Sequence, residues 1–124
     1  MRIPEICRYC GSAVIEGNIR DLYGTGNQKI YYCVNCNAFV TCHKDTGQPM
    51  GKLANFVLRT KRRVVHKVFD SFWKKQGWSR TQAYRWLALS MSLPGGEAHI
   101  GNFEMDECEQ VIRLCRSYER QAAA

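Results

Sequence analysis

The 124-residue chain lacks a long apolar segment. No stretch approaches the roughly 20 apolar residues that cross a membrane, and residues 1–5 have no apolar run of the kind found in a secretory signal. Internal repeats and low-complexity segments are missing as well. We therefore expect a cytoplasmic protein with no membrane partner, in which cysteine side chains stay reduced.

Acidic residues are nearly missing from the middle of the chain. Residues 52–85 carry ten basic side chains and one acidic side chain, Asp70, in a chain of formal net charge +7. Residues 97–109 reverse this pattern, with five acidic residues and no lysine or arginine. Charge that is segregated in this way favours an anionic partner for the basic segment.

Cysteine, by contrast, is abundant and ordered. Four of the seven cysteines form two CxxC motifs that lie 22 residues apart, a spacing typical of a zinc site built from two loops. Gly11 and Asn37 follow the motifs at equivalent positions, where a tight turn favours residues that tolerate positive φ. Four thiolates fill the tetrahedral shell and leave no position for a substrate. The sequence predicts one structural Zn²⁺, bound by Cys7, Cys10, Cys33 and Cys36.

Other roles for these cysteines stay open at this stage. Two disulfides, or four unrelated buried thiols, would use the same residues, although a reducing compartment disfavours disulfides. A rival ligand set consists of Cys33, Cys36, Cys42 and His43. It would leave the first CxxC motif without a role. We prefer a position for His43 beside the ribbon, or in a hydrogen bond to a metal ligand.

Short apolar stretches flank both motifs. Residues 13–15, 30–32 and 39–40 are expected to form short strands. Residues 17–28 are rich in turn-forming types and are expected to be a loop. Together with the zinc site, these stretches predict a zinc ribbon over residues 1–46.

The rest of the chain has the periodicity of three helices. They are predicted over residues 51–75, from a Ser-x-x-Gln capping box at Ser79 through Met91, and over residues 105–120. The first helix is expected to turn an apolar stripe inward: Leu53, Ala54, Val57, Leu58, Val64, Val65, Val68 and Phe72.

These elements predict an α+β fold. An N-terminal zinc ribbon of short antiparallel strands would pack on a C-terminal cluster of three helices in residues 47–121, as one compact unit, and residues 122–124 would form a disordered tail. Cys108 and Cys115 lie seven residues apart on one helix face, so we expect them to be buried as small hydrophobic side chains.

A family resemblance rests on the two CxxC motifs and on a series of later residues in fixed order. The series comprises His43, residues 49–55, residues 59–63, His66, Phe69, Asp70, Trp73, residues 84–88, residues 99–101 and Cys108. With these features the chain resembles a family of small zinc-finger-containing proteins of bacteriophages, prophages and bacteria, of unknown function. The resemblance implies zinc at the four motif cysteines and an accessory role in a bacterial host cell.

Nucleic-acid binding is the function that the basic segment favours, because lysine and arginine on one helix face neutralise phosphates. The three-residue joint between the first two helices also suits a helix–turn–helix. The expected contact residues are Lys52, Arg59, Arg63, Lys67, Lys74, Arg80, Gln82 and Arg85. A simpler interpretation is that this face is merely solvated.

The alternative is a protein-binding adaptor or inhibitor. Its basic face would dock on a host protein or a nucleoprotein complex, for example of a defence system. Trp73 or Trp78 would then be an anchor at the interface, unless both pack in the core.

We do not expect an enzyme. His66 and Asp70 are spaced i, i+4 and can meet on a helix face, but the sequence anchors no third group beside them. The chain has no phosphate-cradling glycine loop, and the predicted zinc site is closed. No small-molecule substrate is therefore expected.

Overall fold

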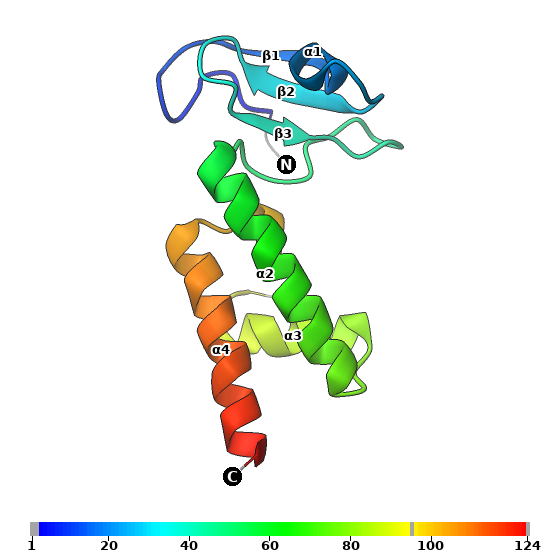
Figure 1. Ribbon diagram of the computed structural model, residues 1–124, viewed down its shortest axis with the longest axis vertical. Coiled ribbons are helices and arrows are strands. Elements are labelled where there is room, and N and C mark those ends of the chain that lie inside the picture. Colours follow the sequence, from blue (N-terminus) through cyan, green and yellow to red (C-terminus); the bar gives the residue numbers. More distant parts are fainter. Residues whose placement is uncertain (1–2, 95, 124) are drawn as a thin grey trace. The chain divides into compact units, whose positions relative to one another are not determined.

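The computed structural model describes residues 3–94 and 96–123 (Figure 1). The described residues divide into two compact units, the first ending at Arg59 and the second beginning at Thr60. Strands occur in the first unit and the long helices α3 and α4 in the second. The α+β class is thus confirmed.

The first unit is built on a three-stranded antiparallel sheet in the order β1-β2-β3. The strands are β1 (Val14–Asn18), β2 (Lys29–Cys33) and β3 (Phe39–Thr41). They confirm the three predicted strands: β2 and β3 are longer than predicted, and β1 begins one residue later and ends three residues later than predicted. The pairing of Val14 with Cys33 places the start of β1 against the end of β2, where the second CxxC motif begins.

A four-residue helix, α1 (Arg20–Tyr23), interrupts the segment predicted to be a loop. Side chains close to it satisfy the backbone: Asn18 Oδ1 accepts a hydrogen bond from the Arg20 amide at 3.1 Å, and Asp21 accepts one from the Asn18 amide at 2.8 Å. Gly24 ends the helix with a φ of 76°. Such local bonds favour a turn of helix where sequence periodicity is too short to indicate one.

The core of the first unit combines sheet side chains with two of the motif cysteines. One buried cluster comprises Cys7, Tyr31, Cys33, Ala38, Val40, Cys42 and Leu53, with Val14 packed against it. Two zinc-ligand candidates are therefore part of the hydrophobic core.

Helix α2 (Phe56–Lys75) begins five residues later than predicted. The backbone of Ala54 instead pairs with that of Phe39, through N–O hydrogen bonds of 3.0 and 3.2 Å. Asn55 then accepts a hydrogen bond from the Leu58 amide at 3.0 Å, as a cap. Because the backbone of Ala54 bonds to the sheet, the helix cannot start before it.

The buried face of α2 also differs from the predicted stripe. Within the second unit, the buried residues of α2 are Arg62, Val65, Phe69 and Phe72, whereas Val64 is 46% exposed. Val57, also assigned to the inward stripe, is 59% exposed. The inward face includes an arginine, whose Nε donates to the Phe103 carbonyl at 2.9 Å. Five of the eight predicted stripe residues are buried, namely Leu53, Ala54, Leu58, Val65 and Phe72. The hydrophobic pattern therefore identified the inward face in part and set it too wide.

The second unit contains α3 (Arg80–Ser90), a 3-10 turn (Ile100–Asn102) and α4 (Met105–Ala123), together with most of α2. Figure 1 shows α2 and α4 running in the same direction, with α3 crossing them. The predicted capping box of α3 is present, with Ser79 and Gln82 in reciprocal hydrogen bonds.

Aromatic contacts join the three helices. Phe72 on α2 lies 5.1 Å from Trp86 on α3 and 5.4 Å from Tyr118 on α4, measured between ring centroids. Trp78 contacts all three rings. Rings at such separations add to the free energy of burial, so this cluster anchors the helical core.

The C-terminal helix is longer than predicted. Helix α4 continues through residues 122–123, where the sequence predicts a disordered tail. Alanine has the highest helix propensity, which favours this extension. Residue 124 lies outside the described residues. Cys108 and Cys115 are both fully buried on α4, as expected.

Candidate metal centre

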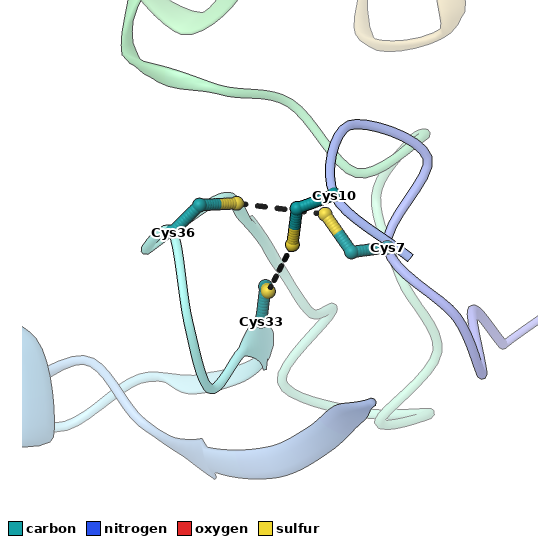
Figure 2. A group of neighbouring side chains, drawn as sticks. All are labelled: Cys7, Cys10, Cys33 and Cys36. Atoms are coloured by element: carbon teal, nitrogen blue, oxygen red, sulfur yellow. Dashed lines mark hydrogen bonds between the residues drawn. The ribbon is translucent and has the colours of Figure 1, made fainter. Parts of the chain in front are cut away.

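The four motif cysteines converge on one point. Their sulfur atoms all lie within 4.8 Å of one another. Figure 2 shows the side chains meeting from two separate loops, with Sγ–Sγ distances of 3.5 Å for Cys7 and Cys36 and 3.4 Å for Cys10 and Cys33. Residues 29 and 23 positions apart in sequence are thereby brought together.

Each loop is a tight turn with the same construction. Gly11 and Asn37 have φ values of 76° and 59°, the left-handed conformation expected from their residue types. Amide groups inside the loops donate to sulfur: Tyr9 N lies 3.4 Å from Cys7 Sγ, and Asn35 N lies 3.3 Å from Cys33 Sγ. These hydrogen bonds hold each sulfur in place within its loop.

Backbone pairing fixes the base of each loop. The Cys7 amide donates to the Ser12 carbonyl at 2.8 Å, and the Cys33 amide donates to the Ala38 carbonyl at 2.8 Å. Cys7 and Cys33 are buried, while Cys10 and Cys36 are exposed. Each motif therefore supplies one sulfur from the core and one from the rim.

The thiols differ in acidity. Hydrogen bonds from Ser12, and then from Cys33, lower the pKa of Cys10 to about 6. At Cys36 the Ala38 backbone lowers the thiol pKa, but loss of solvation and the three neighbouring sulfurs outweigh it and raise the pKa to about 12. Four thiolates this close repel one another unless a cation lies among them.

The donor set and its spacing fit Zn²⁺. A tetrahedral site with Zn–S bonds of about 2.3 Å separates its sulfurs by about 3.8 Å, within the range that the cluster spans. All seven cysteines are free, and the Sγ–Sγ distances of 3.4 and 3.5 Å far exceed a disulfide bond. The cluster holds one structural zinc ion rather than two disulfides.

The rival ligand set is wrong. Cys42 is 1% exposed and belongs to the hydrophobic core of the first unit. His43 is exposed, and its backbone closes a turn with Gly47 and Gln48. Within residues 3–94 and 96–123, the four motif cysteines are the only group of three or more potential ligands that meets the geometry of a metal site.

Two tight cysteine loops against a small antiparallel sheet define a zinc ribbon, a class of zinc finger in which the metal is structural. The chain belongs to the DUF3268 family, a zinc-finger-containing domain of unknown function, which it matches over residues 3–118. No curated protein and no solved structure matches the chain. The fold and the family thus agree on zinc binding.

The predicted basic contact residues fall in both units. Lys52 is exposed in the first unit. Arg59 is partly buried there: its guanidinium lies 3.9 Å from the Phe39 ring centroid, and Nη1 donates to the Ala54 carbonyl at 2.7 Å and the Asn37 carbonyl at 3.5 Å. Arg59 therefore ties the start of α2 to the ribbon.

The other predicted contact residues belong to the second unit, and all are exposed: Arg63, Lys67, Lys74, Arg80, Gln82 and Arg85. The side-chain carbonyl of Gln82 accepts a hydrogen bond from the Ser79 amide at 2.8 Å. Gln82 consequently serves the helix cap. Sequence reasoning missed the buried Arg62, because nothing in its neighbourhood distinguishes it from the basic residues around it.

The two residues spaced as a possible catalytic pair, His66 and Asp70, both lie on α2. Asp70 accepts a hydrogen bond from Trp73 Nε1 at 3.0 Å. Burial lowers the pKa of His66. The nearby Asp70 opposes this shift, and Arg80 adds to it.

In the part of the chain that the structure describes, no helix has the length and apolar character needed to span a membrane.

Proposed function

We propose that the protein binds nucleic acid through exposed basic side chains of its helical unit, as an accessory protein of the bacterial or phage-infected cytoplasm. The proposed contact residues are Arg63, Lys67 and Lys74 on α2, and Arg80 and Arg85 on α3. The zinc ribbon stabilises the fold in this proposal and has no catalytic role.

The arrangement of basic residues on α2 carries the proposal. At about 100° per residue, Arg63, Lys67 and Lys74 lie within about 40° of one another around the helix axis. They face away from the buried Val65 and Phe72. The line extends over about 16 Å, long enough to meet several successive phosphates of a strand.

These charges are also available to a ligand. None of the carboxylates in the described residues forms an ion pair with Arg63 or Lys67, whereas Lys61 pairs with Glu109. Lys74 lies against the face of Trp73, with Nζ 5.6 Å from the ring centroid. Cations without a carboxylate partner release counterions when they bind phosphate, which is the main source of non-specific affinity.

The joint between α2 and α3 supports the same proposal. Gly77, with a φ of 73°, ends α2 and lets the chain turn directly into the cap of α3. Arg80 then occupies the first turn of α3. A helix–turn–helix presents the first residues of its second helix to nucleic acid in this way.

The test is a charge-reversal variant, Arg63→Glu/Lys67→Glu/Lys74→Glu. Its affinity for labelled duplex DNA, single-stranded DNA and RNA is measured by fluorescence anisotropy at about 50 and 200 mM salt. We expect wild-type affinity to fall steeply with salt, and the variant to lose at least about tenfold and to show a shallower salt slope.

A matched control places the same charge change on another exposed helix face, as Arg113→Glu/Arg116→Glu/Arg120→Glu on α4. Circular dichroism and zinc content verify that both variants fold. Equal affinity of the α2 variant and the wild type would remove the basic line from the mechanism. Absence of nucleic-acid binding at low salt would instead favour the docking alternative, although Trp78, one of its anchors, packs among aromatic rings.

A further inference from the structure

Helix α3 and the segment that follows it enclose a groove of about 480 Å³ within the second unit. Its lining combines apolar side chains with arginine, tyrosine and histidine; the residues that matter here are Arg80, Tyr84, Arg85, Leu89, Leu93 and His99. The volume lies in the range of pockets that hold a nucleotide-sized ligand. None of the described residues along the groove is acidic.

The groove includes an exposed apolar side chain. Leu89 is 75% exposed on α3. It lies one helical turn from Arg85, which is also exposed. An apolar wall beside a cationic side chain favours a ligand that has an apolar body and a negative charge.

The aromatic side chain in the groove is held in place by its neighbours. The Tyr84 ring packs edge-to-face on Phe69, with centroids 5.1 Å apart. The Arg80 guanidinium lies 5.2 Å from the Tyr84 ring centroid. A ring held in this way provides a flat surface on which a nucleic-acid base can stack.

The groove lies close to α2. Arg80 lines the groove and lies near enough to His66 on α2 to lower the pKa of that histidine. His66 lies about 100° around the helix axis from Lys67, so a strand that follows the basic line would reach Arg80 by crossing the side of α2 that carries His66.

We propose that the groove receives one unstacked base of a single-stranded nucleic acid, with Arg80 and Arg85 on the flanking phosphates. This inference rests on the proposed function and specifies its ligand. Bases of a duplex are stacked and paired, and must be extruded before they can enter such a groove. Single strands present bases without that cost, so the groove selects them over duplex.

The experiment compares two single strands of about 12 residues. One is oligothymidine, and the other is the same phosphate backbone with abasic sugars throughout. Both strands carry the same charge, but only oligothymidine has bases that can enter the groove. We expect the wild type to bind oligothymidine at least about tenfold more tightly than the abasic strand.

A groove variant, Leu89→Glu, adds a carboxylate at an exposed position and preserves the helix. It should lose the preference for bases and bind the two strands alike. Met105→Glu is the matched control, since Met105 is 40% exposed, lies at the start of α4 and is outside the groove. This control should keep the wild-type preference.

The outcomes separate the two proposals. Equal affinity of the wild type for both strands would overturn the groove assignment and leave backbone binding intact. A preference for bases that survives Leu89→Glu would also overturn it. Failure of both strands to bind at about 50 mM salt would overturn the proposed function itself, and an acidic protein segment would become the better occupant.

Discussion

Single residues in the cysteine loops are selected by backbone conformation. Asn37 has a φ of 59°, the conformation in which Gly11 occurs in the first loop. Asparagine tolerates this conformation better than other residues with a side chain, and glycine adopts it freely. Loop geometry therefore explains a residue that makes no bond to zinc.

Replacement of Asn37 by alanine is expected to destabilise the zinc-loaded protein by about 1 kcal/mol, because alanine is strained at positive φ. Asn37→Gly is the matched control and should unfold close to the wild type. Thermal unfolding, together with competition for zinc by a chelator, measures the effect. Equal losses from the two variants would show that the asparagine side chain, and not the backbone conformation, matters.

The buried cysteines of α4 illustrate a residue-scale effect of burial. Burial raises the pKa of Cys115 from 9.0 to about 12, and also raises the pKa of Cys108. At pH 8 the folded protein should therefore react with iodoacetamide at Cys115 roughly a thousandfold more slowly than the unfolded chain does. Mass spectrometry of labelled peptides measures the two rates.

The same shift predicts how stability depends on pH. The pKa of Cys115 is higher in the folded protein than in the unfolded chain. The contribution of this buried thiol to the free energy of unfolding is therefore complete below pH 9.0 and is lost as the pH rises toward about 12.

The labelling experiment needs a control in which all seven cysteines are reactive, and unfolding in denaturant with a chelator should provide it. Modification of Cys115 in the folded protein at the rate of the denatured chain would contradict its burial.

At the scale of elements, α3 depends on its N-terminal cap. Ser79 accepts a hydrogen bond from the Gln82 amide at 3.1 Å, and Gln82 returns one to the Ser79 amide. Both bonds satisfy amides that have no partner within the helix.

Ser79→Ala should destabilise the protein by about 1 kcal/mol in urea unfolding, without changing its zinc content. Ser79→Asp is expected to retain most of the stability, because aspartate caps equally well. If the Ser79→Ala and Ser79→Asp variants were equally stable, the capping box would not contribute to the stability of the protein.

Some features of the helices can be predicted from the sequence, and others cannot. The capping box was predictable because its residues lie three positions apart. The start of α2 and part of its inward face were not, because Ala54 pairs with Phe39 and Arg62 bonds to Phe103, 41 residues away. Contacts of this kind have no trace in local periodicity.

At the scale of the whole molecule, the two units differ in what stabilises them. The first has a core that includes Cys7 and Cys33, so zinc supplies much of its folding free energy. The second has its own core of aromatic and aliphatic side chains between three helices.

Removal of zinc by a chelator should therefore unfold the first unit and leave the second folded. In NMR spectra of the full chain, amide dispersion should collapse for residues 3–54 and persist for residues 60–123. The Cys10→Ser variant should give the same spectrum without chelator, while Cys108→Ala should retain one zinc per chain. Unchanged dispersion in the ribbon after chelation would show that zinc does not hold it together.

The sequence alone determined the zinc ligands, the αL positions in both loops, the three strands and the cap of α3. Each of these depends on a short local pattern whose spacing is itself the geometric constraint, such as the spacing within each CxxC motif, although the two motifs lie 22 residues apart. Only the tertiary structure decided that Arg59 binds ribbon carbonyls, that Arg62 is buried and that α3 borders a groove. A side chain's exposure and partners are set by segments distant in sequence, and no local pattern encodes them.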